Sequence, residues 1–488
     1  MSLINIQQLT FAYEGSYDPI FENTSFQIDT NWKLGFIGRN GRGKTTFLKL
    51  LLNQYEYSGT ISSSVSFDYF PYPVKNSSQI TIDVLEEILP DYEYWRLSKE
   101  CSLLDLSEEV LYRPFETLSH GEQTKVLLAI LFLKENNFLL IDEPTNHLDR
   151  QARETVSQYL KRKKSFILVS HDRAFLDTCV DHILSINKTD IEVQQGNFST
   201  WQQNKEYSDQ FELAENEKLQ KDIKRLSEAA RRTSNWSDKT EKSKSGPDVP
   251  DRGFVGHKAA KLMKRAKSSE LRMEKSIESK SQLLKNIESN DALKIKPIPY
   301  PQQKLMEANQ LSLFYDEKAI FENISFSVLQ GQRIAIQGKN GCGKTSLLKI
   351  ILGEQKDYQG ILNIGNGLKI SSISQDTSFL KGELDEFARR HDIDLTLFKT
   401  ILRKLDFSRL QFEKKMEDFS EGQKKKVLIA KSLCEQAHLY VWDEPLNFID
   451  VLSRIQIENL ILEYQPTMLL VEHDKKFVDM IATDILYL

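Results

Sequence analysis

The chain has 488 residues, a formal net charge of −5 and 40% hydrophobic residues. This length suffices for two or three domains with full cores, and the small net charge means that any nucleic-acid contact must come from a local basic patch. No apolar run approaches the roughly 18 residues of a membrane span, and the four cysteines lie too far apart for a disulfide framework or a zinc site. We therefore expect no contact with a membrane. Because the N-terminal residues carry no basic-then-apolar signal, we expect a cytoplasmic protein.

The first chemical motif along the chain is a phosphate-binding loop. Residues 38–45, GRNGRGKT, fit the pattern GxxxxGK[ST] between an apolar strand, LGFI, and a helix-like run. The glycines let backbone N–H groups point at phosphates, Lys44 would reach the β- and γ-phosphates, and Thr45 would hold Mg²⁺. This context predicts nucleotide binding.

Three further segments follow in the same half. LSHGEQ, residues 118–123, opens an apolar helix either as a Ser-x-Gly anion site or as an ordinary N-cap. The strand FLLID ends in Asp142 and Glu143. The aspartate suits Mg²⁺ and the glutamate is placed to activate water, although helix N-caps would leave the same pattern. His171 ends the apolar run FILVSH and could sense the γ-phosphate, although a single histidine is more often structural.

The middle of the chain predicts a helical hairpin. Residues 204–238 and 257–290 each fit one long polar helix, and a tip with Gly, Pro and Ser, residues 243–256, separates them. A helix of about 35 residues is about 50 Å long, and its narrow apolar stripe suits one partner helix, so we expect the hairpin to project from the body. Basic and aromatic residues interleave towards the tip, as at a nucleic-acid surface, although a solvated charged linker would look similar. The residues assigned to this surface are Trp236, Lys239, Lys242, Lys244, Phe254, His257, Lys258, Lys261 and Lys264.

The second half of the chain repeats the first. Residues 311–350 can be laid over residues 9–50, and the match continues at FSEGQ, at the strand LYVWD with Asp443 and Glu444, and at LLVEH with His473. A repeat of this length means two copies of one domain. The predicted fold is therefore α/β, with two tandem P-loop nucleotide-binding domains joined by a long helical hairpin. The predicted boundaries are 1–202 for the first domain, 203–302 for the linker and 303–488 for the second domain.

These motifs resemble the ATP-binding-cassette (ABC) family, with two cassettes in one polypeptide. In that family ATP lies head to tail between cassettes, so that each site borrows the other cassette's LSHGEQ or FSEGQ signature. The resemblance implies a monomer with intramolecular pairing, in which Tyr13 and Tyr315 stack on adenine and Gln375 contacts Mg²⁺. One position departs from the family pattern, because Tyr72 stands where the first copy should carry this glutamine.

The motifs and the resemblance together assign two ATP sites with bound Mg²⁺. Catalytic roles go to Glu143, His171, Glu444 and His473. The first ATP site comprises Tyr13, Gly38, Asn40, Gly41, Gly43, Lys44, Thr45 and Thr46, with Ser420 and Gly422 from the second cassette. The second site comprises Tyr315, Gly338, Asn340, Gly341, Gly343, Lys344, Thr345 and Ser346, with Ser119 and Gly121 from the first cassette. The residues assigned to the metal are Thr45, Asp142, Thr345, Gln375 and Asp443.

Fused cassettes with a hairpin between them resemble the ABC-F class, translational ATPases that insert the linker into the ribosome beside the peptidyl-transferase centre. LGFIGRNGRGKTT, LSHGEQ and GFVGHKAAKLMKR look like the ribosome-protection members, nearest to those for lincosamide, pleuromutilin and streptogramin A resistance. Lys44 and Ser119 are 75 positions apart and Lys344 and Ser420 are 76 apart, so the first cassette has no room for the arm of housekeeping ABC-F factors. The partners implied are large-subunit rRNA and exit-site tRNA, not DNA. A housekeeping ABC-F factor and the ATPase of a drug-efflux transporter remain as alternatives.

Overall fold

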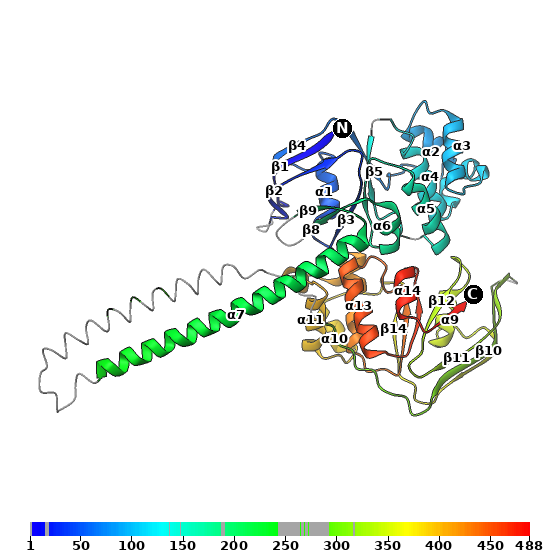
Figure 1. The fold of residues 1–488 in the computed structure, drawn as a ribbon. Helices are drawn as coiled ribbons and strands as arrows, with labels where there is room; N and C mark the ends of the chain where they lie inside the picture. The colour runs from blue at the N-terminus through cyan, green and yellow to red at the C-terminus, as the bar shows by residue number, and fades with distance from the viewer. Residues whose placement is uncertain are drawn as a thin grey trace, which may run out of the picture. The chain divides into compact units, whose positions relative to one another are not determined.

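Two copies of one α/β fold account for the chain outside its middle segment (Figure 1). The computed structural model describes residues 2–14, 19–135, 137–146, 148–186, 191–242, 264, 268, 272, 292–315 and 318–488, with the backbone alone at residues 213 and 229–242. The chain divides into two units: residues 1–199 with 290–488, which contain both copies, and residues 200–289.

The first copy contains an antiparallel sheet, in the order β2-β1-β4, and a second sheet in the order β5-β6-β7-β3-β8-β9. Apolar runs such as FLLI and FILV are buried on both faces of the second sheet, as is typical of central parallel strands. Among its described strands, β9 alone runs antiparallel to its neighbour. The strands are β1 (Leu3–Phe11), β2 (Phe21–Asp29), β3 (Lys33–Gly38), β4 (Ser58–Ser62), β5 (Ser66–Phe70), β6 (Asn137–Asp142), β7 (Phe166–Val169), β8 (His182–Ile186) and β9 (Ile191–Gln195).

Helix α1 (Lys44–Leu51) joins the two sheets of the first copy into one core. Phe47 and Leu50 of this helix belong to the same buried cluster as Ile6 of β1 and Phe36 of β3. The helix starts directly at the phosphate loop, so packing of the core fixes the loop as well. The other helices are α2 (Thr81–Ile88), α3 (Tyr94–Leu103), η1 (Glu108–Tyr112), η2 (Phe115–Thr117), α4 (His120–Leu131), α5 (Arg150–Lys161) and α6 (Arg173–Cys179).

The second copy repeats this order of elements. Its antiparallel sheet has the order β11-β10-β13 and its parallel sheet the order β14-β15-β16-β12-β17. The strands are β10 (Lys304–Tyr315), β11 (Lys318–Leu329), β12 (Arg333–Gln337), β13 (Gln359–Ile364), β14 (Ile370–Ile373), β15 (Leu439–Asp443), β16 (Met468–Val471) and β17 (Asp484–Tyr487). The helices are α9 (Lys344–Ile351), α10 (Leu384–Arg390), α11 (Leu395–Lys404), η4 (Arg409–Glu413), η5 (Met416–Asp418), α12 (Glu421–Cys434), α13 (Val451–Tyr464) and α14 (Lys475–Ile481). The prediction of two α/β copies is confirmed.

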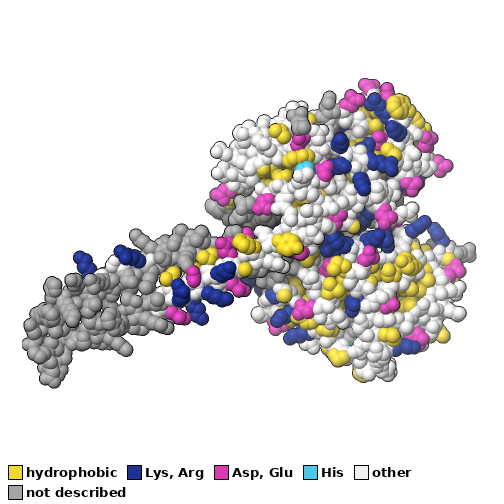
Figure 2. Space-filling view, in the orientation of Figure 1, with side chains coloured by type: hydrophobic (Ala, Val, Ile, Leu, Met, Phe, Trp, Pro, Cys, Tyr) yellow, Lys and Arg dark blue, Asp and Glu magenta, His cyan; other side chains and the backbone are white. Residues whose placement is uncertain are grey.

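Helix α7 (Phe198–Lys242) contains the whole of the first predicted arm, residues 204–238. Over its described side chains, Lys and Arg are interspersed with Asp and Glu (Figure 2). Leu219, Ile223 and Leu226 are half-buried. Of the predicted return arm, residues 264, 268 and 272 are described, and all three are helical. In the part of the chain that the structure describes, no helix is both long and apolar enough to cross a membrane.

Candidate ATP sites

The phosphate loop of the first copy connects β3 to α1. Gly41 and Gly43 have φ of +82° and +91°, in the left-handed region that favours glycine. Lys44 begins α1, and its Nζ donates to the carbonyl oxygens of Gly38 at 2.7 Å and Arg39 at 3.2 Å. Two backbone carbonyls thus hold the ammonium group at the loop, where phosphate oxygens can compete for it.

The second copy builds the same loop between β12 and α9. Gly341 and Gly343 have φ of +80° and +94°. The Nζ of Lys344 donates to the carbonyl oxygens of Gly338 at 3.0 Å and Lys339 at 2.8 Å. The two loops therefore share the left-handed backbone at these glycines and the same lysine contacts, as the repeat predicts.

The aspartate after the buried strand lies beside the loop hydroxyl. Asp142 Oδ2 accepts hydrogen bonds from Thr45 Oγ1 at 2.8 Å and from the Tyr69 phenol at 3.0 Å. Burial raises the pKa of Asp142, while these two hydrogen bonds and Lys44 oppose the rise. In the second copy Asp443 is buried, and its Oδ1 has no hydrogen-bond partner among the described residues. Buried carboxylate oxygens of this kind can accept a cation.

Each candidate catalytic glutamate lies within reach of a histidine. The backbone of Glu143 and Glu444 is left-handed, with φ of +50° and +47°, which turns both side chains out of the strand direction. His171 Nε2 lies 3.2 Å from Glu143 Oε1, and His473 Nε2 lies 3.4 Å from Glu444 Oε1. Burial lowers the pKa of His171 well below its ordinary value, so this imidazole is neutral at pH 7.

The two glutamates differ in protonation. Burial, with a further contribution from Asp142, raises the pKa of Glu143 to about 8. Burial also favours the neutral form of Glu444, but hydrogen bonding to His473 and the charges of His473 and Lys425 outweigh it and lower the pKa of Glu444. At neutral pH Glu444 is therefore ionised, whereas Glu143 is largely protonated.

The position of the predicted glutamine also differs. Strand β5 pairs with β6 and β14 pairs with β15 in the same register, so Tyr72 and Gln375 are equivalent positions. Gln375 Nε2 donates to Glu444 Oε2 at 2.8 Å, whereas the ring of Tyr72 lies 5.9 Å from Lys134 Nζ. In the first copy the nearby Tyr69 donates to Asp142, the aspartate described above. The sequence does not single out Tyr69 as a site residue, because its contact with Asp142 depends on the register of β5 with β6.

The signature serines are helix N-caps. Ser119 forms a capping box with Glu122 at the start of α4, and Ser420 forms one with Gln423 at the start of α12. The N-cap alternative is thus correct for both serines, and it does not exclude anion binding, because a capped helix start still presents backbone N–H groups.

Two cavities contain these residues head to tail. The first, of about 410 Å³, joins one copy's loop to the other copy's signature. It is lined by Tyr13, Asn40, Gly41, Gly43, Lys44, Thr45, Thr46, Asp142, Glu143 and His171, with Ser420 and Gly422. The second, of about 990 Å³, is lined by Tyr315, Asn340, Gly341, Gly343, Lys344, Thr345, Ser346, Gln375, Glu444 and His473, with Ser119 and Gly121. Gly38 and Asp443 end β3 and β15 and Gly338 directly follows β12, and none of the three is among the residues that line these two cavities.

The two tyrosines predicted to stack on adenine lie at the rims of these cavities. Tyr13 is 43% exposed and Tyr315 is 47% exposed, so each ring has a face open to a ligand. The Tyr13 hydroxyl also shares a 2.8 Å hydrogen bond with Thr46 Oγ1 of the phosphate loop.

The predicted linker-tip residues are hardly described. Trp236, Lys239 and Lys242 lie in the described backbone of α7, and Lys264 is helical and exposed. Lys244, Phe254, His257, Lys258 and Lys261 lie outside the described residues. Their assignment to a nucleic-acid surface stays a prediction.

Comparison with known proteins identifies the family of the chain. The sequence pattern of the family described as "ABC transporter" matches residues 21–146 and 321–447, which together make up more than half of the chain. The chain belongs to this family. It is an ABC-F ATPase, with ATP-binding domains that hydrolyse ATP. The family prediction is confirmed.

Relatives resemble the chain over nearly its whole length. It is 28% identical over 482 residues to the ribosome protection protein VmlR of Bacillus subtilis (strain 168), covering 96% of this chain and 84% of that protein. It is 26% identical over 521 residues to the energy-dependent translational throttle protein EttA of Haemophilus influenzae, covering 96% and 88%. Among solved structures, the archaeal ribosome recycling factor aABCE1 in complex with the stalk protein aP1 has the same fold, with a TM-score of 0.65, 20% identity, and coverage of 98% and 87%.

Proposed function

We propose that this ATPase is a ribosome-protection factor. In its ATP-bound, closed form it binds the ribosome and inserts its linker near the peptidyl-transferase centre, where the tip displaces large-subunit antibiotics. The observation that carries the proposal is the pairing of two ATP sites within one chain, each facing the other cassette's signature serine. The similarity to VmlR, which is named a ribosome protection protein, supports the choice of partner.

ATP closes the cassettes in this proposal. Lys44 and the loop N–H groups bind the phosphates from one side, and Ser420 with Gly422 at the start of α12 bind the same γ-phosphate from the other. Lys344 and Ser119 do the same at the second site. Nucleotide therefore bridges the two cassettes, and its hydrolysis removes the bridge.

The carboxylate and hydroxyl at each site fit Mg²⁺. Asp142 and Thr45 share a hydrogen bond, and Asp443 has a buried oxygen without a partner among the described residues. A hard oxygen pair that shares the ion with phosphates is the usual way in which proteins hold this cation. When bound, Mg²⁺ would neutralise charge on the β- and γ-phosphates.

Hydrolysis then depends on the glutamates. Glu444, ionised and held by Gln375 and His473, is placed to orient the attacking water and to accept its proton. Glu143 has the same place at the first site but must first lose its own proton. Loss of the γ-phosphate opens the clamp and releases the protein from the ribosome.

The linker supplies recognition in this proposal. Its basic tip residues, including Lys258, Lys261 and Lys264, would neutralise phosphates of large-subunit rRNA and of an exit-site tRNA. Trp236 and Phe254 would stack on bases or shift rRNA against the bound drug.

A second candidate is a housekeeping translation factor. The match to EttA, named an energy-dependent translational throttle protein, covers 88% of that protein at an identity close to that of VmlR. Such a factor would bind the ribosome by the same ATP chemistry without affecting a drug.

Ribosome binding is tested with Glu143→Gln/Glu444→Gln, which should bind ATP without hydrolysing it. We expect this variant to co-sediment with ribosomes when ATP is present and to stay at the top of the gradient without ATP. Replacing Lys258, Lys261 and Lys264 by Gln should weaken the association. The same change at Lys218, Lys221 and Lys224, which lie on the described part of α7, is the matched control. ATP-loaded protein that stays free would contradict the proposal.

Drug displacement is tested separately. Cells that express the protein should need more lincosamide, pleuromutilin or streptogramin A for inhibition, and cells that express the Glu143→Gln/Glu444→Gln variant should not. Ribosome trapping without a change in any inhibitory concentration would favour the housekeeping role.

A further inference from the structure

A buried ion pair joins the two cassettes beside the first ATP site. Arg173 Nη2 lies 2.5 Å from Glu458 Oε2, and the two side chains are 2% and 5% exposed. Arg173 begins α6 two residues after His171, and Glu458 lies on α13 of the second cassette. The contact thus connects the His171 segment of the first site directly to the opposite cassette.

The repeat shows which residues correspond on the other half. HDRAF aligns with HDKKF, so Lys475 of α14 corresponds to Arg173. Counting the same distance from the N-cap aspartates of α5 and α13, Ser157 corresponds to Glu458. The second half of the interface therefore carries a cation but has a serine in place of its acidic partner.

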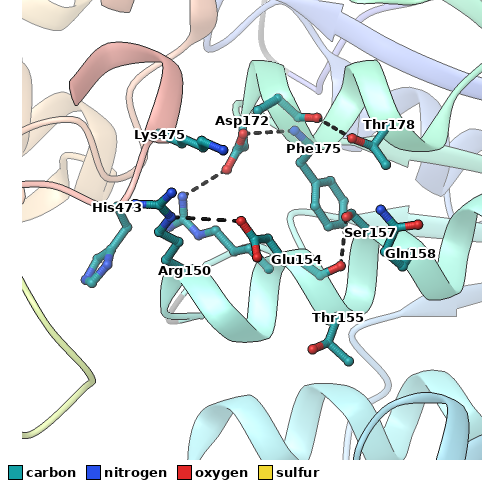
Figure 3. Close-up of a pocket in the computed structure, with 12 residues that line it drawn as sticks. Arg150, Glu154, Thr155, Ser157, Gln158, Asp172, Phe175, Thr178, His473 and Lys475 are labelled. Carbon is teal, nitrogen blue, oxygen red and sulfur yellow. Dashed lines mark hydrogen bonds and ion pairs between the residues drawn. The ribbon is translucent and has the colours of Figure 1, made fainter. Parts of the chain in front are cut away.

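The structure of the second half of the interface is consistent with a serine, Ser157, at the position of Glu458. Ser157 and Lys475 line a cavity of about 460 Å³, with Lys475 entering from α14 and Ser157 from α5 (Figure 3). The Ser157 hydroxyl donates within its own helix, to the Glu154 carbonyl at 2.9 Å. Where the first half has a buried ion pair, the second half has open space.

A second pair of positions shows the same difference. Arg42 of the first phosphate loop lies 3.4 Å from Asp406 of the second cassette. Cys342 lies two residues before α9, as Arg42 does before α1, and Asp105 lies two residues after α3, as Asp406 does after α11. At the second site a thiol therefore stands in place of the guanidinium, and it cannot replace it as a partner for a carboxylate. The cavity at the second site is also the larger, about 990 Å³ against about 410 Å³.

We propose that Glu458 is a positioning residue for the first ATP site. Through its ion pair with Arg173 it fixes the position of the second cassette relative to the His171 segment. As a result, the first site stays closed while the second site opens and exchanges nucleotide. The attraction within a buried ion pair is largely offset by the loss of hydration. The pair therefore determines the relative position of the two cassettes in the closed state more than it stabilises that state. Removal of one partner, however, leaves an unpaired charge in the closed interface and disfavours closure on that half alone.

The test measures release of a fluorescent ATP analogue by stopped flow in the hydrolysis-deficient Glu143→Gln/Glu444→Gln protein. The variants Lys44→Ala and Lys344→Ala assign one kinetic phase to each site. We expect Glu458→Gln to speed release from the first site roughly tenfold, equivalent to about 1.4 kcal/mol, and to leave release from the second site within about twofold. Ser157→Ala, at the corresponding position, is the matched control and should change neither phase.

A double variant separates positioning from a loss of folding. Arg173→Met with Glu458→Leu replaces the pair by apolar side chains of similar size, which buried interfaces tolerate. It should restore slow release from the first site to within about threefold of the parent, with an unchanged unfolding midpoint. Equal acceleration of both phases by Glu458→Gln, or release from the double variant as fast as from Glu458→Gln, would overturn the proposal.

Discussion

The two ATP sites contain the same motifs but differ around the catalytic glutamate. At the second site Gln375 and His473 hold Glu444, whose pKa is lowered, beside a cavity of about 990 Å³. At the first site the glutamine position is Tyr72, and burial raises the pKa of Glu143 to about 8 in a cavity of about 410 Å³. The difference shows that the repeated motif determines the position of the catalytic glutamate, whereas the surrounding residues determine its pKa. We infer that the second site suits turnover and the first suits retention of ATP.

Removal of a loop lysine should have the largest effect, because it deletes one site at a time. Lys44→Ala or Lys344→Ala loses two to three charge-assisted hydrogen bonds to phosphate, which corresponds to roughly a thousandfold weaker binding. Equilibrium dialysis should show half as much ATP bound per chain for each variant. Lys349→Ala, an exposed lysine of α9, should bind as much as the parent. Full binding by Lys44→Ala would mean that its cavity is not an ATP site.

The glutamine position should matter at the second site and not at the first. In a Glu143→Gln background, which isolates the second site, Gln375→Ala should slow hydrolysis roughly thirtyfold because Glu444 loses its orienting donor. In a Glu444→Gln background, Tyr72→Ala should change the rate less than about twofold, since Tyr72 has no place in the catalytic group. Equal losses in the two single-turnover assays would show that both positions serve the reaction alike.

The two sites should respond differently to pH. A general base acts when ionised, and a carboxyl with a pKa of about 8 is about one-tenth ionised at pH 7 and about nine-tenths at pH 9. The Glu444→Gln variant, which hydrolyses at the first site, should therefore speed up roughly tenfold over this range. The Glu143→Gln variant should stay level, because the lowered pKa of Glu444 leaves this group ionised throughout. A level profile for both variants would refute the assignment of a raised pKa to Glu143.

Loss of the Tyr69 hydroxyl should have the smallest effect. Tyr69→Phe removes one hydrogen bond to Asp142, typically worth about 1 kcal/mol, or roughly fivefold. We expect a correspondingly higher Mg²⁺ concentration for half-maximal ATP binding at the first site and no change at the second. Tyr72→Phe is the control with the same chemical change three residues away. A shift at both sites would mean that the phenol acts through the fold as a whole.

Sequence reasoning predicted the parts of the sites that depend on local spacing. The loop glycines, Lys44 and the acidic pairs occupy fixed offsets from a strand end, so the pattern alone locates them. The signature serines were left open between an N-cap and an anion site because both need a helix start, and the structure shows the cap.

Other features could not be read from the sequence because they depend on packing. Tyr69 reaches Asp142 across two paired strands, and nothing in FDYF distinguishes this ring from its neighbours before the register is known. Arg173 and Glu458 are 285 positions apart and meet through the pairing of the cassettes. The raised pKa of Glu143 likewise follows from burial, which no motif encodes.

The most direct test of unequal sites is a comparison of single-turnover ATP hydrolysis by Glu143→Gln and by Glu444→Gln at pH 7. If the second site performs most of the turnover, the Glu143→Gln protein should keep most of the parent rate and the Glu444→Gln protein should lose most of it. The opposite order, with hydrolysis surviving in Glu444→Gln and abolished in Glu143→Gln, would contradict the division of roles between the two sites.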